Sequence, residues 1–153
     1  PVAGDVPDGS ELVWSPGAEK QFTELIASAR AGTTLYVETE QLDSTVLENA
    51  LIDAVKRGVT VNFTMTNTGE FTDGFNTLKT GGVNVHLYPP NAPIYIQSKA
   101  ISVNNDTVYI GSTNFTTTST NADRNVGIIT QKKDIVDGLT ATLIQDFEGA
   151  PAY

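Results

Sequence analysis

The chain has 153 residues, of which 39% are hydrophobic and 18% are charged, a composition typical of one compact globular domain. Nine basic and eighteen acidic residues give a formal net charge of −9, and the cations are scattered along the chain, which disfavours tight nucleic-acid binding. The lack of cysteine excludes disulfides, zinc–thiolate sites and cysteine nucleophiles, and no apolar run reaches the roughly 20 residues of a transmembrane segment.

The first half of the chain alternates helical and strand patterns. Residues 1–11 are rich in proline, glycine and acidic side chains and predict a flexible lead-in or a linker, so that residues 12–153 form the domain. The apolar spacings then predict a helix over 19–30, a strand over 34–38, a helix over 45–57 with Thr45 and Glu48 in capping-box spacing, a strand over 59–66, a helix over 72–79 and a strand over 83–88.

The second half begins with a different pattern. Two adjacent strands over 94–103 and 107–110 are expected to turn at 104–106, and a strand over 125–130 precedes a closing helix over 134–148. Alternating strands and helices followed by a hairpin predict an α/β fold. Its mixed β-sheet should be flanked by helices on both faces.

A polar pattern with fixed spacing lies in this second half. It reads Gln97-x-Lys99-x4-Asn104 and, six residues later, Gly111-Ser112-x-Asn114. The pattern resembles the H-x-K-x4-D-x6-G-S-x-N motif of the phospholipase D superfamily, the HKD-motif proteins. Gln97 stands where the family has histidine, and Asn104 stands where it has aspartate.

The resemblance covers nearly the whole chain. Similar segments lie at 12–16, 36–42, 54–61, 81–88 and 94–131, and together they resemble one lobe of a bilobal phospholipase D-like protein. The resemblance implies that a second lobe or a homodimer mate meets this one at the motif. It also implies a two-step phosphodiesterase reaction in which one histidine attacks phosphorus and another protonates the leaving alcohol, without a metal or cofactor.

On this resemblance, Lys99, Ser112 and Asn114 would bind a phosphate or phosphodiester group. Gln97 cannot take the role of the histidine, because an amide is neither a nucleophile at neutral pH nor a titrating acid. Asn125 stands where the family usually has glutamate, so it replaces a second carboxylate besides Asn104. The motif positions Gln97, Lys99 and Asn104 therefore contain no intact catalytic set, and Lys99 is expected to lack a partly neutralising partner.

Two further residues bear on the site. Glu40 follows the strand over 34–38 and, on the resemblance, belongs to the same face; a solvated loop carboxylate is the alternative. His86, the single histidine, alternates with apolar residues and is expected to be half exposed, pointing away from the more apolar face of its strand. With one histidine and no cysteine, a metal site is not expected.

Three hypotheses follow for the function. The first is a phospholipase D-like lobe with a degenerate motif, inactive alone, which acts as a non-catalytic half or pseudoenzyme and binds phosphate. The second is a phosphodiesterase that is active only when another lobe supplies the catalytic histidine. The third is a secreted binding or defence protein that reuses the fold. Asn-x-Thr triplets at Asn62, Asn105 and Asn114 favour an extracellular location over a soluble cytoplasmic one.

Overall fold

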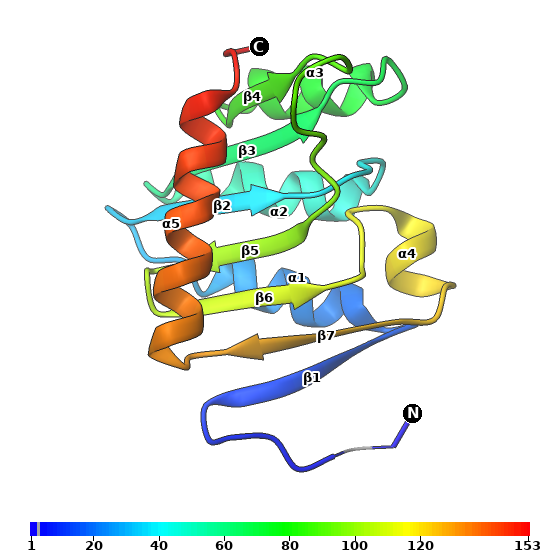
Figure 1. Ribbon diagram of the computed structural model, residues 1–153, viewed down its shortest axis with the longest axis vertical. Coiled ribbons are helices and arrows are strands. Elements are labelled where there is room, and N and C mark those ends of the chain that lie inside the picture. The colour runs from blue at the N-terminus through cyan, green and yellow to red at the C-terminus, as the bar shows by residue number, and fades with distance from the viewer. Residues whose placement is uncertain (3) are drawn as a thin grey trace.

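A seven-stranded sheet with the order β1-β7-β6-β5-β2-β3-β4 runs through the molecule (Figure 1). The computed structural model describes residues 1–2 and 4–153. The strands are β1 (Ser10–Ser15), β2 (Thr34–Glu38), β3 (Thr60–Thr66), β4 (Asn84–Tyr88), β5 (Lys99–Val103), β6 (Thr107–Gly111) and β7 (Asn125–Thr130). The helices are α1 (Ala18–Ala27), α2 (Thr45–Lys56), α3 (Thr72–Thr80), α4 (Thr117–Asn121) and α5 (Lys133–Gly149).

The sheet is mixed, as the sequence predicts. β2, β3 and β4 are parallel, whereas β5, β6, β7 and β1 continue the sheet with antiparallel pairings. In Figure 1, α5 crosses the near face of the sheet, and α1 and α2 lie behind it. The expected α/β fold with helices on both faces is therefore confirmed, and a single lobe accounts for the chain.

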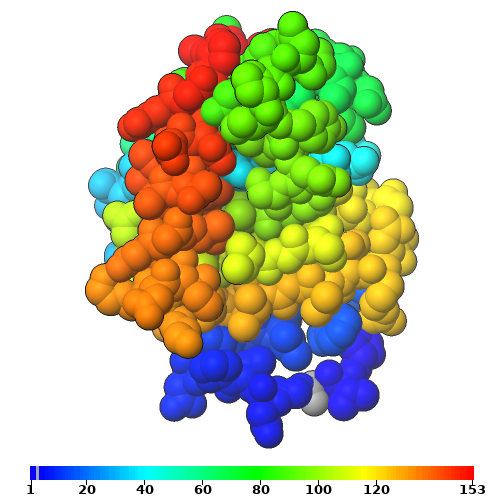
Figure 2. All heavy atoms as spheres, viewed as in Figure 1, coloured from blue at the N-terminus to red at the C-terminus, as the bar shows by residue number. Residues whose placement is uncertain are grey.

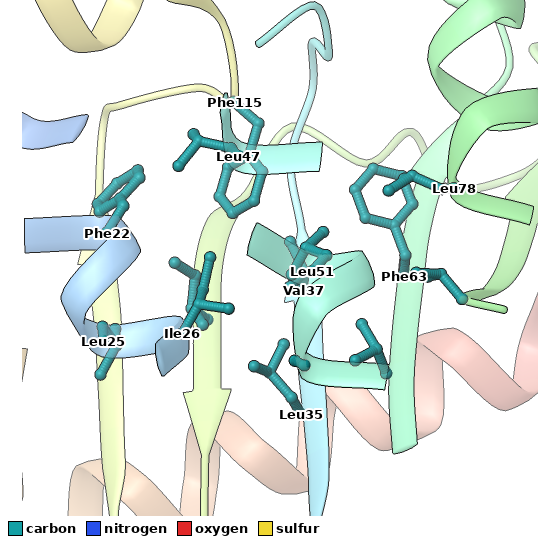
Figure 3. Packing of buried hydrophobic residues seen from close by; sticks show 14 of the residues in the cluster. Phe22, Leu25, Ile26, Leu35, Val37, Leu47, Leu51, Phe63, Leu78 and Phe115 are labelled. Atoms are coloured by element: carbon teal, nitrogen blue, oxygen red, sulfur yellow. The ribbon is translucent and has the colours of Figure 1, made fainter. Parts of the chain in front are cut away.

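The core on the far face is built by the apolar stripes of the helices. Figure 3 shows Phe22 and Ile26 of α1 beside Leu47 and Leu51 of α2, and all four side chains are fully buried. Their spacing of four residues places each pair on one side of its helix, which packs onto the sheet. On the near face, α5 and the segment 89–98 lie side by side over the strands (Figure 2).

Three local expectations differ from the structure. Ser10 and Glu11 belong to β1, although the sequence pattern assigns them to the lead-in. Ser44, rather than Thr45, caps α2, because its side chain accepts a hydrogen bond from the backbone N–H of Leu47. The predicted strand over 94–103 begins only at Lys99.

The short helix α4 is absent from the sequence-based assignment. Its five residues are Thr, Ser and Asn, which favour turns over helix interiors, so local propensity does not reveal it. The side chain of Thr116 caps it by accepting a hydrogen bond from the N–H of Ser119 at 3.1 Å. None of the helices in residues 1–2 and 4–153 has the length and apolar character that crossing a membrane requires.

Candidate functional site

Most of the predicted site residues gather at one edge of the sheet. Because β5 is antiparallel to β2, the start of β5 lies beside the end of β2, and β6 ends at the same edge. Figure 1 shows this edge on the right, where β2 and β6 end and β5 and β7 begin. The structure thereby brings together Gln97, Lys99, Glu40, Ser112, Asn114 and Asn125.

An ion pair lies at the centre of this edge. The Nζ of Lys99 is 3.1 Å from Oε1 of Glu40 and donates a second hydrogen bond, 2.7 Å long, to the carbonyl of Gln97. The two side chains are only 14% and 22% exposed. The expectation that Lys99 lacks a neutralising partner is therefore wrong. Glu40 lies at the same edge and partly compensates the charge of Lys99.

Asn114 holds the loop that carries Glu40. Its buried Oδ1 accepts hydrogen bonds from Oγ1 of Thr39 and N of Glu40, both at 3.1 Å, and from N of Gln41 at 3.2 Å. In the described part of the chain no protein group accepts from its Nδ2. Asn114 thus positions Glu40 through its oxygen, and its amide nitrogen has no acceptor among the described residues.

The hydroxyl of Ser112 is engaged with β7. It donates to Oδ1 of Asn125 at 2.9 Å and accepts from the backbone N–H of Val126 at 3.1 Å. The Nδ2 of Asn125 donates in turn to the carbonyl of Ser119. To bind a phosphoryl oxygen, the Ser112 hydroxyl must therefore turn its proton away from Asn125.

The position of the family's histidine is open to solvent. Gln97 is exposed, and among the described residues its side chain makes no hydrogen bond. The single histidine lies elsewhere: β4 is separated from β5 by β3 and β2. The ring of His86 stacks on Phe147 with a centroid distance of 3.7 Å, and its Nδ1 is 2.6 Å from the Phe147 carbonyl. As predicted, His86 is half-buried and faces away from the apolar side of its strand.

Asn104 does not belong to this site. It lies just beyond the far end of β5, and five residues of extended chain span roughly 17 Å. Its φ of 59° is left-handed. Its Oδ1 accepts from the N–H of Arg30 at 2.9 Å, and its Nδ2 donates at 3.0 Å to the carbonyl of Ser28, which caps the C-terminus of α1. Asn104 is a structural cap.

The replacement Asn104→Asp, which restores the family's residue, is expected to destabilise the fold by about 1–2 kcal/mol. The carboxylate would lose the donor to Ser28 and place a negative charge at the C-terminal end of α1. Urea denaturation at pH 7 would measure the change. Asn105→Asp is a matched control, because Asn105 is exposed and has a similar φ of 54°. Equal effects of the two substitutions would contradict the capping role.

A second polar cluster, not predicted from the sequence, lies on the near face. The hydroxyl of Ser98 donates to Oε2 of Glu38, whose Oε1 is buried without a hydrogen-bond partner. Burial raises the pKa of Glu38 to about 8; the bond from Ser98 opposes this, and Asp146 of α5 adds to it. The sequence indicates only that Glu38 and Tyr36, two residues apart in one strand, lie on the same face of the sheet. The contact of Glu38 with Asp146 depends on how α5 packs, which no local pattern specifies.

The aromatic ring of Tyr95 extends the site edge. It is 49% exposed, and its pKa is raised by burial and by the nearby carboxylates of Glu40 and Glu70. In residues 1–2 and 4–153, no group of three histidine or acidic side chains is arranged to hold a metal ion. The site edge therefore combines one compensated cation, amide and hydroxyl donors, and an exposed aromatic ring.

The sequence matches a known family model, and the fold is similar to solved structures. A family model described as "Cardiolipin synthase, PLD-like domain" matches residues 22–147. The fold is similar to that of Nuc from Salmonella typhimurium, a phospholipase D family member, with a TM-score of 0.83, 23% identity, and coverage of 94% of this chain and 97% of that chain. NucT from Helicobacter pylori gives a TM-score of 0.81, 14% identity, and coverage of 94% and 98%. No curated protein sequence matches the chain.

Proposed function

Because this chain belongs to the phospholipase D superfamily, as a single PLD-like domain, we propose that it is a lobe without catalytic activity of its own that retains a weak site for a phosphate or phosphodiester group. The observation that carries the proposal is the side chain at the nucleophile position. Gln97 is exposed at the site edge beside Lys99, and an amide can neither attack phosphorus nor act as a general acid or base near pH 7. His86, which packs against Phe147, does not replace it.

The remaining donors support anion binding. An ammonium group has three donors, and Lys99 uses two of them for Glu40 and the carbonyl of Gln97, so one is left for a ligand. The Nδ2 of Asn114 and a reoriented Ser112 hydroxyl would supply two more. Since Glu40 repels an anion and the chain carries a net charge of −9, binding is expected to be weak and sensitive to salt.

The test is to restore the nucleophile. Hydrolysis of bis(p-nitrophenyl) phosphate would be measured for the unmodified chain, Gln97→His and Gln97→His with Asn125→Glu. The unmodified chain is expected to show no turnover above background. The histidine variants are expected to gain it, because p-nitrophenolate leaves as the anion and does not need a second histidine to protonate it. Gln145→His on the exposed side of α5 is the matched control and should stay inactive. Asn104→Asp is left out, because Asn104 lies at the other end of β5.

Two results would count against the proposal. Turnover by the unmodified chain would show that it is an enzyme in its own right. If neither phosphate nor the phosphodiester perturbs the amide signals of Ser112 and Asn114 in NMR titrations, the proposed binding site does not exist. The two halves of the proposal, inactivity and phosphate binding, are thus tested separately.

A second candidate function is that of half of a composite phosphodiesterase. Apolar side chains flank the site edge: Ile94, Tyr95 and Val126 are 40–49% exposed. Such a surface beside an incomplete site suits contact with another phospholipase D-like lobe, either a different chain or a second copy. Light scattering of the purified chain would test the second copy. A monomer up to millimolar concentration, with no activity on mixing with a histidine-bearing lobe, would exclude this candidate.

We also propose an extracellular location, which is supported only by the three Asn-x-Thr triplets, the acceptor sequences for N-glycosylation. Asn62 and Asn114 are buried, with 9% and 8% exposure. Asn105 is exposed in the turn between β5 and β6. A glycan on the folded chain would therefore be accepted only at Asn105, and peptide mass mapping of the native protein would detect it.

A further inference from the structure

A cavity of about 390 Å³ lies between the N-terminal ends of α2 and α3. Four acidic side chains line it: Asp43, Glu48, Glu70 and Asp73. The aromatic ring of Phe71 lines it as well. We call this cavity the acidic pocket. Lys99 and the other residues of the site edge are not among the residues that line it, so it is a separate feature from the site proposed above.

Glu48 is the buried member of this set. Only 4% of the residue is exposed, and its carboxylate makes no hydrogen bond or ion pair with any residue in 1–2 and 4–153. Glu48 and Gly74 both line the cavity, and a Cβ added at Gly74 would lie 3.3 Å from Oε1 of Glu48. A buried carboxylate without a partner is costly, and burial together with the charge of Asp43 raises the pKa of Glu48.

The other three carboxylates are also uncompensated by cations. None of the ion pairs within the described residues includes Asp43, Glu70 or Asp73. Among the described residues, Asp43 accepts only from the N–H of Thr117, and Glu70 only from the hydroxyl of Thr68. The two helix N-termini contribute roughly half a positive charge each, which offsets about one of the four negative charges. The acidic pocket therefore favours a cation.

The chemistry of the cation follows from the geometry. No three of these carboxylates, nor any others in the part of the chain that the structure describes, converge as metal ligands would. An ammonium or guanidinium group instead needs separate acceptors at hydrogen-bond distance, and an aromatic wall adds to its binding. We propose that the acidic pocket binds a primary ammonium or guanidinium group, with Glu48 as its innermost partner.

Binding of agmatine, which carries both groups, would be measured by calorimetry and by NMR titration in 0.15 M salt. We expect saturable binding with amide shifts confined to the first turns of α2 and α3. Glu48→Gln should weaken it at least tenfold while keeping the side-chain shape. Glu148→Gln removes the same charge from the exposed end of α5 and should change the affinity by less than twofold, because salt screens distant charges.

A parallel titration with an acetylated tetrapeptide that contains one arginine tests whether the bound cationic group belongs to a protein or to a small amine. Tighter binding of the peptide would assign the pocket to a protein partner, and tighter binding of agmatine to a small amine. Equal weakening by Glu48→Gln and Glu148→Gln, or saturable Ca²⁺ binding that depends on Glu48, would overturn the proposal. Asp73→Asn serves as the second pocket variant if Glu48→Gln fails to fold, and it too should weaken binding.

Discussion

Replacement of Gly111 by alanine is expected to destabilise the fold by about 3 kcal/mol or more, and it should also disturb the site edge. A Cβ at this position would lie 2.5 Å from Cα of Gly127 and 2.7 Å from the Val126 carbonyl. It would also overlap the hydroxyl of Tyr109. Because backbone atoms of β7 form part of the obstacle, no change of rotamer can relieve the clash.

Gly111 has this constraint because two glycines face each other across β6 and β7. Tyr109 lies over the Gly111–Gly127 pair, packs edge-on against Phe22 with a centroid distance of 4.6 Å, and accepts a hydrogen bond from the N–H of Thr113. The glycine of the Gly-Ser-x-Asn pattern is thus needed for packing, independently of any ligand. The same glycine sets the path of the chain into Ser112.

Gly138→Ala is the matched control for this experiment. Gly138 lies inside α5 with nothing within 4 Å of an added Cβ, so alanine there should stabilise the fold by about 0.5–1 kcal/mol. Urea denaturation followed by circular dichroism would measure both variants. A loss of less than about 1 kcal/mol for Gly111→Ala would show that β6 and β7 can separate at this point, contrary to the tight packing.

The second large effect concerns pH. The free energy of unfolding is expected to fall as the pH rises from about 5 to 8, because Glu38 is protonated in the folded chain and ionised in the unfolded one. Burial raises its pKa to about 8 from an ordinary 4.5. When the pKa of a group is higher in the folded than in the unfolded chain, the group stabilises the fold fully at a pH below the unfolded pKa. This stabilisation is lost as the pH rises to the folded pKa. At about 1.4 kcal/mol per pKa unit, the loss approaches roughly 5 kcal/mol.

Glu38→Gln isolates this contribution. The amide resembles the protonated acid, accepts from Ser98 and can donate toward Asp146. The variant should match the unmodified chain near pH 4.5 and exceed its unfolding free energy by several kcal/mol at pH 8. Glu148→Gln serves as the exposed control and should leave the pH dependence unchanged. Parallel stability curves for Glu38→Gln and the unmodified chain would mean that Glu38 ionises freely in the fold.

Local patterns were sufficient for most of the fold. The strands over 34–38 and 125–130 were predicted with the bounds that the structure has, because each is a run of strand-forming residues between clear turn signals. β1 was not assigned, since its partner β7 lies more than 100 residues away in the chain. The cap at Ser44 was misplaced by one residue, because Ser44 and Thr45 both suit that position.

The structure brings most of the predicted site residues to one edge of the sheet, but their contacts were less predictable. The motif spacing alone predicted that Lys99, Ser112 and Asn114 belong to one site. The pairing of Lys99 with Glu40 depends on β2 lying beside β5, which no local pattern specifies. The separation of Asn104 from the site was available from the sequence, because a residue five positions along a strand lies far from Lys99. The pocket around Glu48 needed the packing of α2 against α3.

The position of β1 in the sheet has a consequence for folding during synthesis. Its neighbour β7 leaves the ribosome more than 100 residues later, so the sheet cannot be closed on this side until residues 125–130 have emerged. Until then Val13, which is fully buried in the finished fold, has no strand beside it. Native pairing of β1 with β7 is a late step with a high contact order, and the nascent chain exposes an unpaired, aggregation-prone strand in the meantime.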